Sequence, residues 1–333
     1  MSSIPTIKFG VPGDKITVPR IGLGTMTLTG GYGSFDIAES TAILNRAIDI
    51  GCTFWDTADS YGFGANEKLL GSVLNQRGEN VFVGTKFGLL LKNPGPDFDG
   101  DFSKIFQGIS GTPEYVREQV ESSLESLGVD RIDLYYQHRV DPSVPIEVTV
   151  GAMAELVKEG KVRYLGLSEC TADELRRAYK VHPIAAVQFE YSPWTTDIER
   201  NGVLDACREL GVTVVAYSPL GRGFLAGNIR KNEDLDKTDW RRSNPRFQQE
   251  SIDNNLKLVE GLDALAKKHG KSKVQMTLAW LLTQEPNMIV IPGTRRVKYL
   301  DENSGAGNIT LTDEEIRDIR QLVDSIDIKG SRY

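Results

Sequence analysis

The runs IDLYYQH (132–138), VRYLGLS (162–168) and VTVVAYS (212–218) set the structural pattern of this 333-residue chain. Each run is nearly continuous in apolar and aromatic residues, and each ends on polar residues. Strands that are buried on both faces of a parallel sheet have this composition. Runs of the same kind begin near Ile21, Thr53, Val81, Ala186 and Met288. The sequence therefore predicts eight strands.

Helical stretches separate the predicted strands, and two of them have clear capping signals. Thr112-Pro113 opens one helix, which Gly128 ends, and Thr312 with Glu315 forms a capping box that opens the last. Further helices are predicted at residues 38–50, 66–76, 147–159, 171–180, 199–210, 255–269, 272–284 and 297–303. Eight strand-then-helix units are the number found in a (β/α)8 TIM barrel. We therefore expect a single α/β barrel domain over residues 1–333.

Four segments extend beyond the eight units. Residues 4–18 predict an N-terminal β-hairpin, and residues 310–333 predict a C-terminal helix and tail. Residues 89–111 and 221–250 are long connections that follow the carboxyl ends of strands. Barrels of this type bind ligands at that face, so we predict that both connections are site loops. The alternative is that they are tolerated surface insertions.

Composition excludes several classes of protein. The chain has 39 Lys and Arg against 46 Asp and Glu, and this net charge of -7 argues against a nucleic-acid partner. Cys52, Cys170 and Cys207 lie far apart and only three histidines are present, so we expect free thiols and no metal site. The sequence shows neither a signal peptide nor an apolar run of membrane-spanning length. The expected location is the cytoplasm, with no membrane partner.

Ionisable side chains stand at the ends of successive predicted strands. Asp56 ends the second strand and is followed by Tyr61, Lys86 ends the third, and His138 ends the fourth. A buried Lys86 needs a carboxylate, and Asp56 is the natural partner. A lysine cation beside Tyr61 is expected to lower the phenol's pKa toward neutrality, so that Tyr61 can give or take a proton. The alternative is a purely structural network.

These groups suggest a site that protonates an oxygen atom. His138 could orient a carbonyl group through a hydrogen bond, while Tyr61 supplies the proton. None of the four side chains can supply a hydride, so an organic cofactor would have to do so.

Three segments carry a strong resemblance to the aldo-keto reductase superfamily: TFWDTADSYG (53–62), VGTKFG (83–88) and YYQHRVDP (135–142). The resemblance covers nearly the whole chain and is closest to the branch that includes perakine reductase and related microbial reductases. It continues through GLGTM (22–26), GKVRYLGLSE (160–169), VQFEYSPW (187–194), YSPLGRGFLAG (217–227) and IPGTRRVKYLDEN (291–303).

The resemblance implies an NADP-dependent oxidoreductase of the alcohol dehydrogenase (NADP+) type, which reversibly reduces a small aldehyde or ketone. Tyr61 would be the general acid, Lys86 would lower its pKa, Asp56 would pair with Lys86, and His138 would orient the carbonyl. The residues implied to bind NADPH/NADP+ are Gly24, Thr25, Met26, Asp56, Ser168, Gln188, Tyr217, Ser218, Pro219, Leu220, Gly221, Arg222, Gly293, Thr294, Arg295, Arg296, Tyr299, Glu302 and Asn303.

The implied roles divide the cofactor residues by the part of NADPH that they would hold. Gln188 and Ser168 would hold the nicotinamide carboxamide, and Tyr217 would stack on the ring. Ser218, Leu220 and Gly221 would line the pyrophosphate. The 2′-phosphate suits the guanidinium forks of Arg295 and Arg296, together with Gly293 and Thr294. Glu302 and Asn303 would hold the adenine.

Two residues depart from the family pattern, and several alternatives stay open. Glu169 stands where Asn is common, which leaves open the second contact to the nicotinamide amide. Tyr299 stands where Arg or Gln is common, so NADH remains an alternative cofactor. Residues 240–246 are either a solvated loop or a lid over the cofactor phosphates, and Trp194 is either core packing or a wall of the substrate pocket. A nucleotide-sensing regulatory subunit, as in the potassium-channel β family, is an alternative function, as is a dedicated secondary-metabolite or pyridoxal reductase. The oligomeric state is not inferable.

Overall fold

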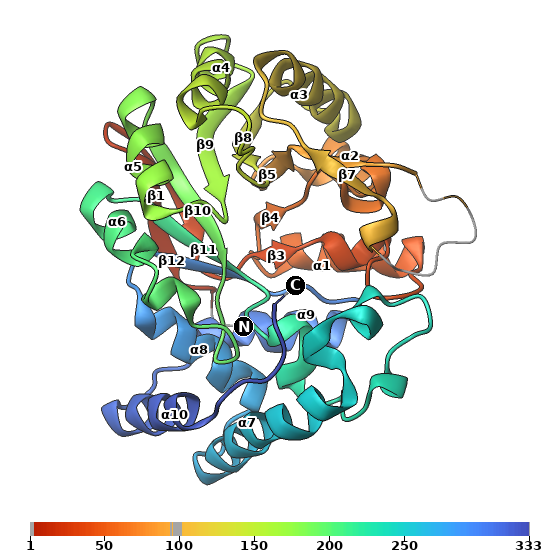
Figure 1. Ribbon diagram of the computed structural model, residues 1–333, viewed down its shortest axis with the longest axis vertical. Coiled ribbons are helices and arrows are strands. Elements are labelled where there is room, and N and C mark those ends of the chain that lie inside the picture. Colours follow the sequence, from red (N-terminus) through yellow and green to blue (C-terminus); the bar gives the residue numbers. More distant parts are fainter. Residues whose placement is uncertain (1–2, 94, 96–101, 333) are drawn as a thin grey trace.

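An eight-stranded parallel sheet closes on itself at the centre of the computed structural model, which describes residues 3–93, 95 and 102–332 (Figure 1). Gly22 N donates to Val290 O at 2.9 Å, and Val290 N donates to Arg20 O at 2.9 Å, so the last strand pairs with the first. This confirms the predicted barrel. Its strands are β3 (Leu23–Gly24), β4 (Phe54–Asp56), β5 (Phe82–Phe87), β8 (Ile132–Gln137), β9 (Val162–Ser168), β10 (Ile184–Glu190), β11 (Thr213–Tyr217) and β12 (Met288–Ile291).

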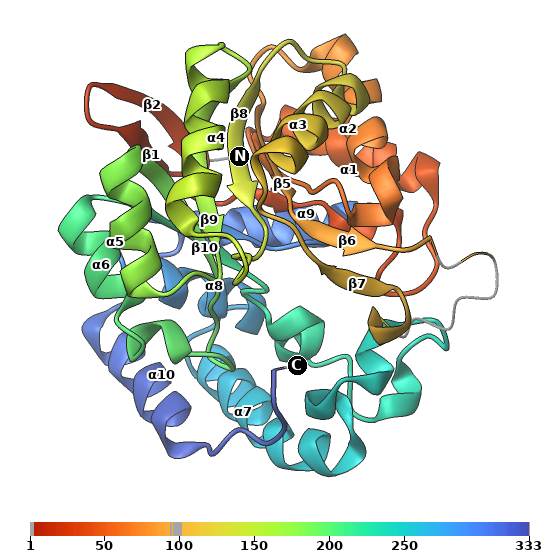
Figure 2. The same ribbon diagram turned by 45° about the horizontal axis from the view of Figure 1, so that its top comes forward.

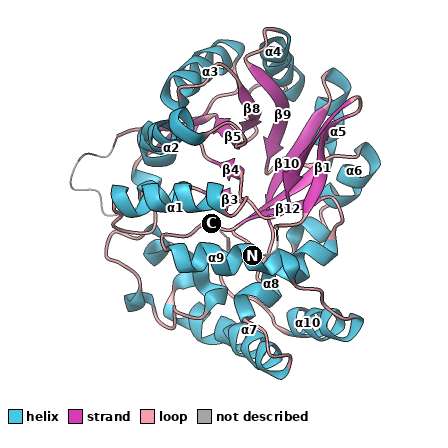
Figure 3. Cartoon of the chain, turned by 180° about the vertical axis from the view of Figure 1, so that it is seen from behind, coloured by secondary structure: helices cyan, strands magenta, loops and turns pink. Residues whose placement is uncertain are grey.

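Helices surround the strands on the outside of the barrel (Figure 3). Thr112 caps α3 by accepting a hydrogen bond from Tyr115 N, and the capping box of Thr312 and Glu315 opens α10, as predicted. The helices are α1 (Ile37–Asp49), α2 (Ala65–Arg77), α3 (Pro113–Leu127), α4 (Ile146–Lys158), α5 (Ala172–Val181), α6 (Val203–Leu210), α7 (Gln249–Lys268), α8 (Lys273–Gln284), α9 (Val297–Gly305) and α10 (Asp313–Ser325).

Two predicted helix starts are wrong. Helix α6 begins at Val203 rather than at residue 199, because Gly202 adopts a left-handed φ of 81° and separates the helix from the 3-10 turn Asp197–Glu199. Helix α7 begins at Gln249 rather than at residue 255. Its first turn contains no apolar residue before position 252, so the apolar periodicity underestimated the length of this helix.

The N-terminal hairpin of β1 (Thr6–Val11) and β2 (Asp14–Pro19) is present as predicted. Phe9 is fully buried, and its ring meets those of Phe54, Phe82 and Tyr164 at centroid distances of 5.9, 5.2 and 5.5 Å. Phe54 lies in β4 and Phe82 in β5, both before the residues that end those strands at the site. The hairpin therefore packs on the end of the barrel opposite the site.

Both long connections contain structure of their own (Figure 2). In the first, β6 (Leu89–Leu91) pairs with β7 (Phe106–Ile109) as an antiparallel hairpin, while residues 94 and 96–101 lie outside the described residues. The second contains 3-10 turns at Gly221–Ala226, Asn232–Asp234, Trp240–Ser243 and Pro245–Phe247. Residues 1–2 and 333 are also outside the described part, so the single domain over 1–333 stays a prediction.

Gly166 in β9 tests the packing of the barrel interior. A methyl group at this position would lie 2.3 Å from Cδ1 of the fully buried Tyr136. We expect Gly166→Ala to lower the free energy of unfolding by about 1–3 kcal/mol, because it overpacks the core. Urea denaturation measures this loss.

Gly151 provides the matched control, because it lies in α4 with nothing within 4 Å of an added methyl group. Gly151→Ala should raise the free energy of unfolding by up to about 1 kcal/mol through its better helix propensity. A Gly166→Ala variant as stable as the wild type would contradict the close packing against Tyr136.

Candidate active site

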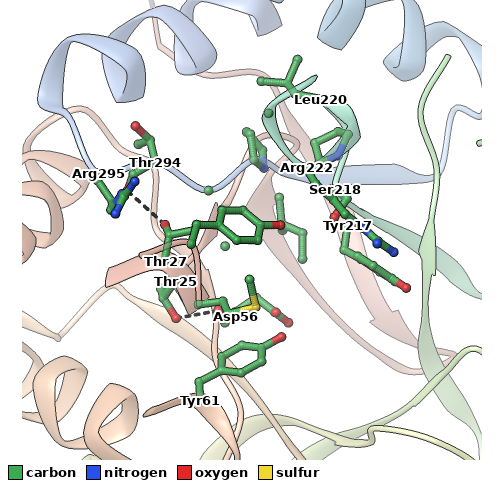
Figure 4. Close-up of a pocket in the computed structure, with 18 of the residues that line it drawn as sticks. Thr25, Thr27, Asp56, Tyr61, Tyr217, Ser218, Leu220, Arg222, Thr294 and Arg295 are labelled. Carbon is green, nitrogen blue, oxygen red and sulfur yellow. Dashed lines mark hydrogen bonds between the residues drawn. The ribbon is translucent and has the colours of Figure 1, made fainter. Parts of the chain in front are cut away.

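A groove lies at the carboxyl ends of the barrel strands and encloses about 900 Å³, including the part open to solvent (Figure 4). Most of the predicted site residues line it: Gly24, Thr25, Met26, Asp56, Tyr61, Gln188, Tyr217, Ser218, Pro219, Leu220, Arg222, Gly293, Thr294 and Arg295. Sequence analysis did not place six further lining residues there: Thr27, Tyr32, Gly223, Arg241, Ile291 and Pro292. Of these, Gly223 and Arg241 fall in the predicted site loop at residues 221–250, and Ile291 and Pro292 fall in the segment 291–303 that resembles the family, whereas Thr27 and Tyr32 had no sequence signal.

The fully buried ammonium group of Lys86 joins the predicted catalytic residues. Its Nζ donates hydrogen bonds to Asp56 Oδ1 and to Thr57 O, both at 2.6 Å, and to the Tyr61 hydroxyl at 3.2 Å. The strand pairing of β4 with β5 sets this geometry, because Asp56 and Lys86 end adjacent strands and Tyr61 follows β4 in a short turn. The arrangement brings an acid, a cation and a phenol together.

The charges of the ion pair depend on each other. Burial lowers the pKa of Lys86, but Asp56 and Tyr61 more than offset this effect, so the pKa is raised overall and the lysine stays protonated. Asp56 has a second donor, since Gln188 Nε2 lies 2.6 Å from its Oδ2. Both carboxylate oxygens are therefore hydrogen-bonded, as a buried anion requires.

The expected lowering of the Tyr61 pKa is wrong for this structure. Burial raises the pKa of Tyr61 above its usual value near 10 and outweighs the opposing effect of the Lys86 cation, while the negative charge of Asp56 raises it further. Sequence alone could not give the depth of burial. Tyr61 is therefore a fully protonated phenol at neutral pH, which suits a proton donor.

His138 faces the edge of Tyr61, with ring centroids 5.9 Å apart. Burial lowers the pKa of His138 well below its usual value of 6.5, and the positive charges of Lys86 and Arg139 add to this effect. The imidazole is therefore neutral at physiological pH. Its Nδ1 is buried without a hydrogen-bond partner among the described residues. A neutral imidazole of this kind can donate one N–H to a carbonyl oxygen.

Arg295 lies beside Thr294 at one end of the groove (Figure 4). Burial lowers the pKa of Arg295, and the positive charges of Arg241 and Arg296 lower it further. Asp239 pairs with Arg241, and Glu39 pairs with Arg296 at 2.7 Å. Bound anionic groups would relieve the repulsion between these guanidinium groups. The cluster therefore fits the 2′-phosphate implied for NADPH.

The structure does not bring every predicted cofactor residue to the groove lining. Arg296, which precedes α9, and Tyr299, which lies in the first turn of α9, are both exposed. Ser168 is buried, and its hydroxyl lies 3.3 Å from Arg139 Nη1. Glu302 accepts a hydrogen bond from the Ser272 hydroxyl at the start of α8. The predicted residues that do not line the groove are Lys86, His138, Ser168, Gly221, Arg296, Tyr299, Glu302 and Asn303.

Arg241 of residues 240–246 lies at the groove rather than in solvent, and a lid over the cofactor phosphates stays a prediction. Arg241 is buried, and its guanidinium carbon lies 4.0 Å from the centre of the Tyr32 ring. Its Nη1 donates to Arg222 O at 2.6 Å. These contacts connect the 221–250 loop with the loop that follows β3, and all three residues line the groove.

Trp194 packs in the core and does not line the groove. It is 2% exposed, and its ring lies 4.5 Å from that of Phe224 and 5.4 Å from that of Phe247. An added methyl group on Gly221 would lie 2.6 Å from the indole, so this glycine permits the loop to pack closely on Trp194.

Within residues 3–93, 95 and 102–332, His, Cys, Asp and Glu form no group of three or more that could hold a metal ion. No helix in the described part of the chain is long and apolar enough to cross a bilayer.

Comparison with known proteins gives matches over almost the whole chain. A family model described as Aldo/keto reductase family matches residues 20–324. Aldo-keto reductase str7 of Strobilurus tenacellus is 48% identical over 99% of this chain and 95% of its own length. Aldo-keto reductase yakc of Schizosaccharomyces pombe, whose name specifies NADP(+), is 45% identical over 99% of this chain and 95% of its own.

Solved structures share the barrel. The glycerol dehydrogenase AKR11B4 of Gluconobacter oxydans has a TM-score of 0.85 at 27% identity, covering 97% of each chain. The aldo-keto reductase AKR11C1 of Bacillus halodurans, in its holo form, has a TM-score of 0.76 at 23% identity, covering 99% of this chain and 98% of that one. The second match bears on the fold alone.

Replacing Asp56 tests the buried ion pair. We expect Asp56→Asn to lower the free energy of unfolding by about 3–5 kcal/mol, because Lys86 is left without its carboxylate in a buried position. Urea denaturation at neutral pH measures the loss. The double variant Asp56→Asn/Lys86→Met removes the cation as well and should recover most of the stability. Equal stability of Asp56→Asn and the wild type would contradict a charged, buried Lys86.

Proposed function

Because the chain belongs to the aldo/keto reductase family, we propose that it reduces an aldehyde or ketone to an alcohol with NADPH, in a reversible reaction. The observation that carries the proposal is the Tyr61 hydroxyl, which lies 3.2 Å from the buried Lys86 ammonium and lines the groove. A protonated phenol beside a fixed cation is suited to protonate an oxygen atom that becomes negatively charged.

The residues that line the groove support NADPH as the bound cofactor. Thr294, Arg295 and the neighbouring Arg296 would hold the 2′-phosphate, and Ser218 to Leu220 would line the pyrophosphate. Tyr217 and Gln188 would contact the nicotinamide end, beside Tyr61. Bound NADPH supplies the hydride that reduces the carbonyl carbon. The name of the S. pombe relative supports NADP(+) as the cofactor.

The side chains of this protein would supply the proton. Tyr61 donates its phenolic proton to the substrate oxygen, and the Lys86 cation stabilises the phenolate that remains. Asp56 keeps Lys86 charged and in place. The neutral His138 donates an N–H to the same oxygen and so orients the carbonyl group. In the reverse direction the phenolate of Tyr61 takes the proton from the alcohol.

Tyr61→Phe tests the proton donor. We expect kcat for carbonyl reduction to fall by roughly 10²–10⁴-fold, because the general acid is removed. The affinity for NADPH, measured by fluorescence titration, should stay close to the wild-type value. Tyr179→Phe, a change of the same size in α5, is the control and should leave kcat unchanged. Near-normal turnover of Tyr61→Phe would reject the assignment.

The pH dependence tests the protonation states. Because the pKa of Tyr61 is raised above its usual value, the phenol stays protonated up to about pH 9, and reduction should lose activity only as the pH rises through that pKa. Oxidation needs the phenolate, so its kcat/KM should rise as the pH increases over the same interval. Steady-state rates in both directions, from about pH 6 to about pH 11, measure the two profiles.

His138→Gln serves as the control for the pH profiles. The pKa of His138 lies well below 6.5, so its titration should not contribute a limb near neutrality. The variant should turn over more slowly with the same shape of profile. Oxidation that is fastest at the acid end would contradict Tyr61 as the proton acceptor.

A further inference from the structure

The segment after α10 returns across the carboxyl face of the barrel (Figure 2). The side chain of Asn255 in α7 makes two hydrogen bonds to the backbone of this segment. Lys329 N donates to Asn255 Oδ1 at 2.9 Å, and Asn255 Nδ2 donates to Lys329 O at 3.0 Å. Gly330 has a left-handed φ of 84° and packs so closely on Arg246 that an added methyl group would lie 2.8 Å from its backbone. The segment therefore places the side chains that follow Gly330 at the site.

Arg332 inserts its guanidinium between two carboxylates at the mouth of the barrel. Its Nη2 lies 2.6 Å from Glu169 Oε2, and its Nε lies 3.1 Å from Glu190 Oε2. Glu190 also pairs with Arg222 at 2.8 Å, and Arg222 donates to the carbonyl oxygen of Arg332 at 3.1 Å. Arg332 is 17% exposed and Glu190 is 1% exposed, so solvent screens these charges little.

Glu169, which stands where Asn is common in the family pattern, belongs to this network of ion pairs. Its Oε1 accepts hydrogen bonds from the Tyr217 hydroxyl at 2.9 Å and from Glu190 N at 3.0 Å. Its backbone has a left-handed φ of 54°, a conformation that strains a residue other than glycine. The carboxylate contacts are therefore positioned to offset a strained backbone. They hold Tyr217 and Arg332.

Tyr217 connects the network to the cofactor groove. It ends β11 and lines the groove, close to Ser218 and Arg222 (Figure 4). Its hydroxyl meets Glu169 at 2.9 Å and Arg332 Nη2 at 3.4 Å. Two anchors on one hydroxyl fix the orientation of the ring, which is the surface that the nicotinamide would contact.

We propose that Glu169 and Arg332 act as a pair of positioning residues for Tyr217, so that the C-terminal segment completes the nicotinamide subsite. This inference rests on the proposed function. Neither residue touches the reacting atoms, and both act through the Tyr217 ring. Loss of the pair should leave the barrel folded but allow the ring to move, which weakens NADPH binding and loosens the choice of the nicotinamide face that gives up hydride.

The test compares NADPH binding by the full chain and its variants. Fluorescence titration should give a Kd for Arg332→Gln and for Glu169→Gln that is raised on the order of tenfold. The double variant should bind about as weakly as either single variant, because both changes remove the same support from one ring. Lys329→Gln is the matched control, because the Lys329 side chain is a cation of the same segment and pairs with Asp327. Its Kd should equal that of the wild type.

A second readout separates positioning from general destabilisation. With NADPH deuterated on one face of C4, the wild type should transfer a single isotope, whereas Arg332→Gln should transfer a mixture. Tyr217→Phe keeps the ring but removes the anchored hydroxyl, so it should raise the Kd in the same way. It replaces Arg332→Gln as the test if that variant does not fold.

The outcomes distinguish the two proposals. Wild-type protein that does not bind NADPH would overturn the proposed function. Wild-type protein that binds NADPH, together with Arg332→Gln and Tyr217→Phe variants that match its Kd and its isotope selectivity, would overturn the positioning role alone.

Discussion

The burial of one ammonium group is the constraint on which the site depends. Lys86 has no exposed surface, and an unpaired charge in such a position costs several kcal/mol. Its partners are the carboxylate of Asp56, the carbonyl of Thr57 and the hydroxyl of Tyr61. These come from β4 and the turn after it, so the pairing of β4 with β5 determines both the stability of the barrel and the chemistry of the groove.

Burial and the charge of Lys86 together set the protonation state of the Tyr61 phenol. Burial favours the neutral phenol, and the Lys86 cation opposes it without prevailing. A neutral phenol beside a neutral His138 offers two donors to an incoming oxygen, whereas taking a proton from an alcohol first requires the phenolate. The cation matters most after proton transfer, when it faces the negative charge that forms on the phenol oxygen. The electrostatics therefore suit reduction at neutral pH.

The sequence was sufficient to predict the barrel and to bring Asp56, Tyr61 and Lys86 together, because both depend on local patterns. Continuous apolar runs predict buried strands, and ionisable residues such as Asp56 and Lys86 at their ends predict a shared face. The sequence was insufficient to predict the features of the site that depend on long-range contacts. No periodicity indicates that Arg332 returns to Glu169, or that Tyr32 meets Arg241. The pKa of Tyr61 depends on depth of burial, which spacing does not encode.

At the mouth of the barrel, the charge of Glu169 is balanced by an arginine from the C-terminal segment. Glu169, Glu190, Arg222 and Arg332 together carry two negative and two positive charges in a poorly solvated place. With an asparagine at position 169, Arg332 would lose one of its two carboxylate partners and would share Glu190 with Arg222. The glutamate and the arginine of the tail therefore form one feature. Because Glu169 also holds Tyr217, this charge balance extends to the ring that lines the cofactor groove.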